Sequence, residues 1–443
     1  MSHALENVTS GAAAASGEIA ERLARAKTAF YSISMLPVEV RNRALRAMAR
    51  LVEEHSQAWL SANRQDQDTW QGKLAEELFA RLCLSESRIR EVARGIRDVE
   101  ALPDPIGRVL DRTLLDDGLT LDKVTVPLGV IAMVFESRPD VLPQILALAL
   151  KSGNSAVVKG GSETRASNRA FMAIIEEVEA EVPELPHGWA TLIETRDDFH
   201  ELLRYPEYVD LVIPRGSNEL VRAIMDATQI PVLGHADGIC HTYIHQAADL
   251  DKAIRVAIDG KAQYPAVCNA TETLLVDARL APAFLPRFAE AAAARGVVLK
   301  ACERTRGVLA DLEPAGEEDW SAEYLDLRLA VRVVDGLDQA IEHINRYGSH
   351  HTDAIVTEDA AAREAFLARV DSATVIANAS TRFADGYRFG LGAEVGISTL
   401  KTHARGPVGL EGLTIYKYVL RGAGQIVADY VGPNARPFRH KKI

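Results

Sequence analysis

Cys268 is the residue of this chain best placed for nucleophilic chemistry. It lies in the stretch 264–272, YPAVCNATE, which runs directly into the apolar segment 273–276. A cysteine on a proline-containing loop before a buried strand can present its sulfur to a cleft while the strand fixes its position, as a nucleophile requires. Because a free cysteine is also among the most often buried residue types, the local sequence leaves a structural role open.

Two glycine-containing turns could serve a phosphorylated cofactor. Lys159, Gly160 and Gly161 end one strand pattern, and Gly216 and Ser217 join another strand to a helix. In open parallel sheets ligands bind beyond the carboxyl ends of strands, and helix N-termini bind phosphate through free N–H groups. No Gly-x-Gly-x-x-Gly fingerprint follows a predicted strand, so ordinary turn chemistry remains the alternative at both places.

Arg138 and the pair His350-His351 are further candidates for a site. Arg138 follows the buried-strand pattern 129–135 and should emerge at the strand end, where its guanidinium could bind a carboxylate or a phosphate. A solvated surface arginine is the alternative. Adjacent histidines diverge on a turn or a strand, and no set of ligands at metal spacing surrounds them, so we predict no metal site.

The elements that must position these residues follow from hydrophobic periodicity. Residues 18–99 repeat apolar side chains at helical spacing, which predicts an opening of about four helices. An Asp117-Gly118 turn between alternating segments predicts a projecting β-hairpin. From 129 to about 378, strands alternate with helices, which predicts parallel, doubly wound α/β structure, with a second such pattern beginning near Gly234. The final β-like pieces, 413–420 and 425–427, could pair with the hairpin.

Composition places the chain among ordinary globular proteins. Its 443 residues, 47% hydrophobic and 25% charged, predict two or three domains. The net charge of -12 argues against a nucleic-acid partner. Four widely spaced cysteines suggest a reducing compartment, the cytoplasm. No apolar run approaches the roughly 20 residues of a membrane span, and we expect 1–17 to be a disordered lead rather than a signal peptide.

Four segments of the chain resemble the gamma-glutamyl phosphate reductases, a family of the aldehyde dehydrogenase superfamily. They occur in the family's order and are GVIAMVFESRPDV, LALKSGNSAVVKGGSE, YPAVCNATETLLV and VDGLDQAIEHINRYGSHHTDAI. The resemblance runs from about Gly17 to the end of the chain. It implies an α/β, aldehyde dehydrogenase-like fold with two doubly wound α/β domains and a β-hairpin oligomerisation element.

The resemblance also implies where the domains lie along the chain. An NADP-binding variant Rossmann domain would span 18–111 and 127–237, and a catalytic domain bearing Cys268 would span 238–410. The oligomerisation hairpin and C-terminal strands would occupy 112–126 and 411–443, so a homo-oligomer, a dimer or a tetramer, is expected. The superfamily's variant Rossmann domain lacks the glycine fingerprint, which accounts for its absence here.

By the same resemblance, Lys159 would contact the cofactor ribose, and Gly216 and Ser217 would lie near the pyrophosphate. The further glycine that usually follows the Gly-Ser motif is replaced by the residues 219–221, ELV, which leaves the phosphate contacts open. Ser162 stands where NAD-preferring relatives often have a carboxylate. Without that negative charge a 2′-phosphate is tolerated, so NADPH is the expected cofactor.

A departure from the superfamily pattern at Val232 bears on the reaction. Hydrolytic aldehyde dehydrogenases carry a water-activating glutamate at the head of a Glu-Leu-Gly-Gly motif, whereas residues 232–235 here are VLGH. A cysteine without this base suits acyl transfer between sulfur and phosphate better than hydrolysis. We therefore predict that Cys268 attacks L-glutamate 5-phosphate and that NADPH reduces the thioester to L-glutamate 5-semialdehyde, a step of proline biosynthesis.

The remaining site residues are predicted around this chemistry. The backbone N–H of Cys268 and the Ser137 region would stabilise the oxyanion, while Arg138, Asn269, His351 and Glu394 would contact the substrate. Two rivals share many of these features: an aldehyde dehydrogenase that acylates coenzyme A, and a non-catalytic NADP-binding scaffold.

Overall fold

The computed structural model describes residues 2–234, 237–391 and 393–443. The chain divides into two compact units. Unit 1 comprises Met1–Gly216, Ala223–Val232 and Gly409–Ile443, and unit 2 comprises Ser217–Arg222 and Leu233–Val408. The predicted cofactor domain ends at 237, whereas the division into units falls inside 217–232, and the hairpin and C-terminal segment belong to unit 1.

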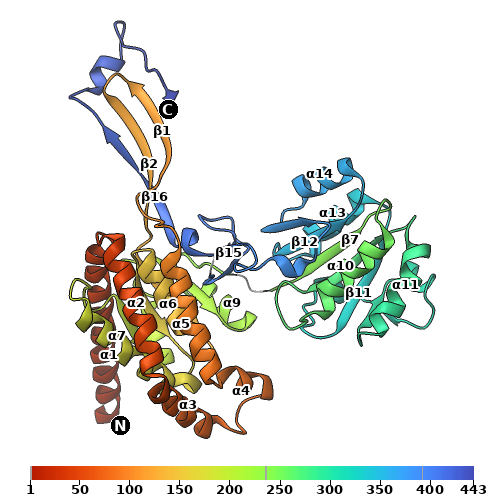
Figure 1. Ribbon diagram of the computed structural model, residues 1–443, viewed down its shortest axis with the longest axis horizontal. Helices are drawn as coiled ribbons and strands as arrows, with labels where there is room; N and C mark the ends of the chain where they lie inside the picture. The colour runs from red at the N-terminus through yellow and green to blue at the C-terminus, as the bar shows by residue number, and fades with distance from the viewer. Residues whose placement is uncertain (1, 235–236, 392) are drawn as a thin grey trace. The chain divides into compact units, whose positions relative to one another are not determined.

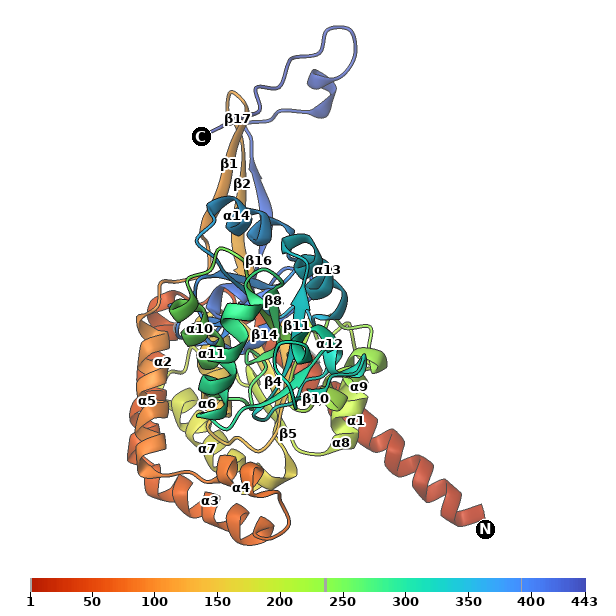
Figure 2. The ribbon, with the colours of Figure 1, turned by 90° about the vertical axis from the view of Figure 1, so that its right-hand side faces the viewer.

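Helices open unit 1. They are α1 (Ser2–Ile33), α2 (Val38–Glu54), α3 (Ser56–Trp70), α4 (Glu76–Leu82) and α5 (Glu86–Ala101). The segment 1–17, predicted to be a disordered lead, is instead helical from Ser2. The N-terminal end of α1 runs away from the other helices of the unit (Figure 2). The structure also has one helix more here than predicted.

A parallel four-stranded sheet forms the core of unit 1. Its order is β5-β4-β3-β6. The strands are β3 (Val130–Phe135), β4 (Ser155–Lys159), β5 (Ala190–Ile193) and β6 (Leu211–Arg215), and the helices between and after them are α6 (Val141–Lys151), α7 (Arg165–Glu181), α8 (Arg196–Leu202) and α9 (Asn218–Ala227). Every residue of β3 is buried, as its continuous apolar sequence predicts for a strand covered on both faces. The strand order reverses at β3, the place where such sheets bind ligands at the strands' carboxyl ends.

A hairpin and a C-terminal strand form a second sheet of unit 1, which extends away from α2 and α5 (Figure 1). Strands β1 (Val109–Asp116) and β2 (Leu119–Pro127) meet at the predicted turn, where Gly118 has φ +70°. Strand β16 (Thr414–Arg421) pairs antiparallel with β2, which confirms the predicted pairing. The second predicted piece, 425–427, is wrong. Gly422 and Gly424 end the strand, a short 3₁₀ helix follows at Val427–Tyr430, and β17 (Lys441–Lys442) pairs with β1 instead.

Unit 2 is a parallel seven-stranded sheet with the order β10-β9-β11-β8-β7-β12-β13. The strands are β7 (Cys240–Ile244), β8 (Thr271–Asp277), β9 (Val298–Ala301), β10 (Glu313–Pro314), β11 (Arg328–Val334), β12 (Thr352–Val356) and β13 (Thr374–Ala377), and the helices are α10 (Leu250–Ala262), α11 (Ala281–Ala293), α12 (Glu303–Arg306), α13 (Leu337–Tyr347) and α14 (Ala360–Arg369). A small two-stranded sheet pairs β14 (Gly396–Ser398) with β15 (Gly406–Val408).

Helices cover both faces of the unit 2 sheet (Figure 1). On one face Phe284 and Phe288 of α11 pack with Leu274 of β8. On the other, Phe366 of α14 packs with Tyr243 of β7. This arrangement confirms the doubly wound α/β fold predicted from the alternation of strands and helices. Among the described residues, no helix is both long enough and apolar enough to cross a membrane.

Candidate active site

Cys268 lies on the connection from α10 to β8, at the amino edge of the unit 2 sheet. Strand β8 is buried along its whole length between β11 and β7, so it fixes the end of this connection. Cys268 itself is half-buried. Gly238 packs against it so closely that a Cβ atom at position 238 would lie 2.3 Å from the Cys268 Cα. Only glycine fits there, and the loop's path is therefore set by a backbone-to-backbone contact.

A buried ion pair fastens the base of the Cys268 loop. Lys261 at the end of α10 donates through Nζ to Glu272 Oε2 of β8 at 2.5 Å, and the two side chains are 1% and 0% exposed. Burial raises the pKa of Glu272 to about 7, and burial also lowers the pKa of Lys261. Both shifts favour the neutral forms, so desolvation outweighs the attraction between the charges. The pair joins the two elements that flank the loop.

The segment 380–384 is tied to the same loop at three points. Thr381 Oγ1 lies 3.2 Å from Thr271 Oγ1. Asn269 Nδ2 donates to the carbonyl oxygen of Ala384 at 2.8 Å, and Arg382 Nε donates to Gln263 Oε1 at 2.9 Å. The predicted residue Asn269 is thus 4% exposed and its amide nitrogen is engaged. Its Oδ1 is buried and makes no hydrogen bond with any described residue.

His351 supports the loop from behind. Its ring is fully buried, with Nδ1 2.8 Å from Thr352 Oγ1 and 3.8 Å from the sulfur of Cys240. Cys240 in turn donates to the carbonyl oxygen of Cys268 at 3.1 Å, and burial keeps the pKa of the Cys240 thiol well above its ordinary value. Cys240 therefore lies between His351 and the backbone of Cys268.

Other candidates in unit 2 have structural partners. Glu394 accepts a hydrogen bond from the N–H of Gly386 at 2.8 Å and so braces the loop that follows Arg382. His350 Nδ1 lies 2.6 Å from the carbonyl oxygen of Asp371. Among the described residues, no three histidine, cysteine or acidic side chains converge as a metal site. His235, which belongs to the departure at 232–235, lies outside the described residues.

Ser137 and Arg138 lie just beyond β3 in unit 1. Ser137 adopts φ +46° and donates through both its N–H and its Oγ to Glu163 Oε1, at 2.6 and 2.8 Å. Both of its donors are therefore bonded to Glu163 in this structure, and its part in an oxyanion site stays a prediction. Arg138 Nη2 lies 3.3 Å from Asp140 Oδ2 and remains partly exposed.

Lys159, the last residue of β4, lies at the same edge of the unit 1 sheet. It is half-buried, forms no ion pair among the described residues, and burial lowers its pKa. A Cβ atom at Gly161 would lie 1.9 Å from Glu163 Oε1, so the Glu163 carboxylate packs against the turn after Lys159 and only glycine fits there. Ser162 is exposed and begins a 3₁₀ helix (Ser162–Thr164). A lysine at the carboxyl end of a strand lies where open parallel sheets bind their ligands.

Gly216 and Ser217 are exposed between β6 and α9. Because β6 neighbours β3, this junction follows the same sheet edge as Lys159. Ser217 Oγ accepts from the N–H of Leu220 at 3.4 Å. Of the predicted residues, unit 1 thus carries Ser137, Arg138, Lys159, Ser162 and Gly216, and unit 2 carries Ser217, Cys268, Asn269, His351 and Glu394.

Sequence reasoning missed several residues that shape the site. Glu272 stands as a lone charge in the strand-like run ATETLLV, and a charge inside a buried strand is a signal that it needs a partner. Lys261, Gly238 and Arg382 carry no comparable signal, because their partners are reached only through the tertiary fold.

Comparisons with known proteins agree with this geometry. The model of the aldehyde dehydrogenase family matches residues 3–304. A gamma-glutamyl phosphate reductase of Synechococcus sp. (strain JA-3-3Ab) is 52% identical over 97% of this chain and 95% of its own length. One from Methanosarcina barkeri is 50% identical over 96% and 98%. The crystal structure of the gamma-glutamyl phosphate reductase of Thermotoga maritima has a TM-score of 0.90 at 40% identity, covering 92% of this chain and 99% of that one.

Proposed function

Because the chain belongs to the gamma-glutamyl phosphate reductase family of aldehyde dehydrogenases, we propose that it reduces L-glutamate 5-phosphate to L-glutamate 5-semialdehyde and phosphate. It is an oxidoreductase that takes a small-molecule substrate and a nicotinamide cofactor, and the reaction is a step of proline biosynthesis. The observation that carries this proposal is the fixed, half-buried Cys268 loop in a chain with Val232 where hydrolytic relatives hold a water-activating glutamate.

The first step is acyl transfer to sulfur. The Cys268 thiolate attacks C5 of the substrate, the S–C5 bond forms, and the C5–O bond to phosphorus breaks as inorganic phosphate leaves. The Cys268 N–H donates to no other described residue and is our proposed donor to the oxyanion. Asn269, Arg138, His351 and Glu394 stay proposed substrate-site residues, with His351 and Glu394 acting through the loops that they brace.

NADPH is the cofactor that we propose, held by Lys159 and by the turns at Ser162 and at Gly216-Ser217. When bound, it supplies the hydride that reduces the thioester to the aldehyde. Burial lowers the pKa of Lys159, while the charges near it are mixed, with Glu163 and Glu136 opposing Arg196 and Arg165. The preference for NADPH therefore rests on Ser162, which places no negative charge at the ribose position.

We also propose that the chain works in the cytoplasm as a homo-oligomer, a dimer or a tetramer, joined through the hairpin and β16. Tyr416, Tyr418 and Leu420 alternate along β16 and are 43%, 62% and 57% exposed. Alternate residues of a strand share one face, so three large apolar side chains lie uncovered on the same side. Such a row is typical of a surface that a partner buries.

The function is tested most simply in reverse. The purified protein should reduce NADP⁺ with L-glutamate 5-semialdehyde only when inorganic phosphate is present. Replacing phosphate with coenzyme A should abolish the reaction. Activity with coenzyme A and none with phosphate would favour the acylating rival, and no turnover with either would favour the scaffold.

A further inference from the structure

Arg382 is a buried cation without an acidic partner. It lies in the short 3₁₀ helix Thr381–Phe383 and is 8% exposed. Its Nε donates to Gln263, but its two terminal nitrogens make no hydrogen bond with a described residue, and no described carboxylate lies within 4 Å of them. An arginine buried to this degree is normally paired.

The surroundings of Arg382 make a bound anion favourable. Burial is the main cause that lowers its pKa, and the neighbouring Arg388 lowers it further, while Asp385 and Asp259 raise it without forming an ion pair with Arg382. Arg388 donates to the carbonyl oxygen of Arg382 at 3.1 Å and is itself paired with Asp385 at 3.5 Å. A ligand with negative charge would compensate the desolvation of Arg382.

Arg382 also lies beside the nucleophile. Its neighbours Thr381 and Ala384 are bonded to Thr271 and Asn269, which flank Cys268. Cys268 raises the pKa of Arg382 by charge attraction, whereas burial lowers it. The Oδ1 of Asn269, next to Cys268, is a second buried polar group and has no hydrogen-bond partner among the described residues.

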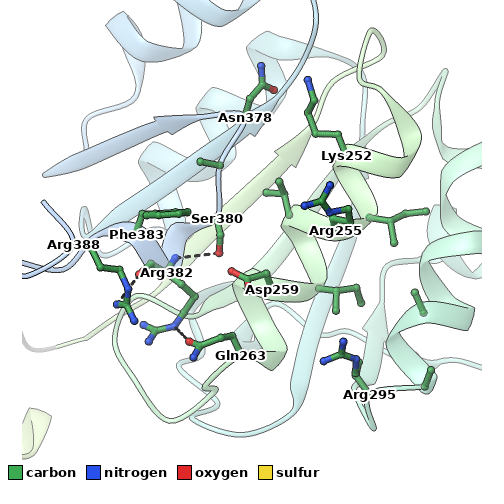
Figure 3. Close-up of a pocket in the computed structure, with 16 residues that line it drawn as sticks. Lys252, Arg255, Asp259, Gln263, Arg295, Asn378, Ser380, Arg382, Phe383 and Arg388 are labelled. Carbon is green, nitrogen blue, oxygen red and sulfur yellow. Dashed lines mark hydrogen bonds between the residues drawn. The ribbon is translucent and has the colours of Figure 1, made fainter.

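A cavity of about 1020 Å³ in unit 2 reaches Arg382 from another side (Figure 3). It is lined by α10, α11 and the segment 378–388. Its charged lining residues are Lys252, Arg255, Arg295, Arg382, Arg388 and one acid, Asp259. Cys268 is not among them, so this hollow is not the space over the sulfur.

We propose that Arg382 binds an anionic group of the substrate, either its carboxylate or its phosphate, while Cys268 attacks C5. A guanidinium offers two parallel donors that match the oxygens of either group. This assignment rests on the proposed function and adds a specificity-determining residue to it.

The reverse assay tests the assignment. Arg382→Gln should raise one Michaelis constant by about 50-fold with a smaller change in kcat, as expected for loss of a charge-assisted hydrogen bond. A rise in the KM for phosphate identifies the phosphate, and a rise in the KM for the aldehyde identifies the carboxylate. Arg382→Lys should recover part of the loss. Arg295→Gln removes an exposed charge from the same cavity and serves as the control.

Both constants remaining within about twofold of the Arg295→Gln values would overturn the proposal. If Arg382→Gln does not fold, Arg382→Lys decides, since a lysine lacks the two-pronged donor and should raise the same constant by about tenfold.

A second readout does not need turnover. Inorganic phosphate or L-glutamate should slow alkylation of Cys268 by iodoacetamide, followed by peptide mass, in the wild type but not in Arg382→Gln. An inactive wild type would refute the proposed function, and equal protection of both proteins would refute the role of Arg382.

Discussion

Cys268 is held in place by close contacts with single neighbouring residues. Gly238 touches its backbone, Cys240 donates to its carbonyl oxygen, and Asn269 anchors the next position to Ala384. None of these contacts needs a charged group beside the sulfur. The nucleophile's position therefore depends on shape, and small changes of shape should affect the rate.

Gly238→Ala should lower kcat by roughly 100-fold, because the added methyl would displace the Cys268 backbone and misplacing a nucleophile by about 1 Å has that effect. Cofactor binding should persist, since the proposed cofactor residues Lys159 and Ser162 belong to unit 1. Gly95→Ala, in α5 with open space around it, is the matched control and should leave kcat unchanged. Steady-state kinetics and NADPH fluorescence titration measure both quantities. Unchanged kcat in Gly238→Ala would contradict the close packing.

Lys159→Ala should raise the KM for NADPH by about tenfold, the effect of losing one charge-assisted hydrogen bond. Phosphate release in a single turnover, which reports attack by Cys268, should be unaffected, because Lys159 takes no part in that step. Arg169→Ala is the control. Arg169 is an exposed residue of α7 and is paired with Glu194. An unchanged KM in Lys159→Ala would remove this residue from the cofactor site.

Two elements, α10 and β8, carry the Cys268 loop between them, and the Lys261–Glu272 pair joins their ends. The raised pKa of Glu272 means that the folded state favours its protonated form. The resulting stability is present below the ordinary pKa of 4.5 and is lost as the pH rises to about 7. Over this window the free energy of unfolding should fall by roughly 3 kcal/mol from this group.

Glu272→Gln removes the titrating proton and should flatten the pH dependence between about pH 4.5 and 7. Urea denaturation at several pH values measures it. Glu358→Gln, which breaks the exposed Lys252–Glu358 pair, should leave the profile like that of the wild type. Parallel profiles for the wild type and Glu272→Gln would contradict the raised pKa.

The elements with strong local patterns could be predicted from the sequence. The buried-strand pattern at 129–135 forms β3, Val130–Phe135, and the Asp117-Gly118 turn forms the expected hairpin. The residues that hold the site could not be predicted from the sequence, because their partners are distant in the chain. Arg382 meets Gln263 from 119 positions away, and Cys240 meets Cys268 from 28. Local periodicity contains no information about such pairs. The local sequence already made Cys268 a candidate nucleophile, and the family resemblance supplied its reaction and its cofactor.

At the scale of the whole molecule, strand β16 exposes a row of large apolar side chains, Tyr416, Tyr418 and Leu420. Replacing Tyr418 and Leu420 together by aspartate should dissociate the proposed oligomer, because a partner cannot bury these charges without cost. Light scattering after gel filtration measures the mass. Lys417→Glu, on the opposite face of the strand, is the control and should keep the mass of the wild type. A monomeric wild type, or an unchanged mass in the double variant, would contradict assembly through this face.

Catalysis through Cys268 is tested most directly by Cys268→Ala, with Cys302→Ala as the matched control. Cys302 is half-buried, its sulfur lies 3.3 Å from Thr305 Oγ1, and it follows the carboxyl end of β9, at the opposite edge of the parallel sheet from the Cys268 loop. Cys268→Ala should bind NADPH as the wild type does but lose phosphate-dependent NADP⁺ reduction with L-glutamate 5-semialdehyde, while Cys302→Ala keeps it. Turnover that persists in Cys268→Ala would contradict a thioester at this residue.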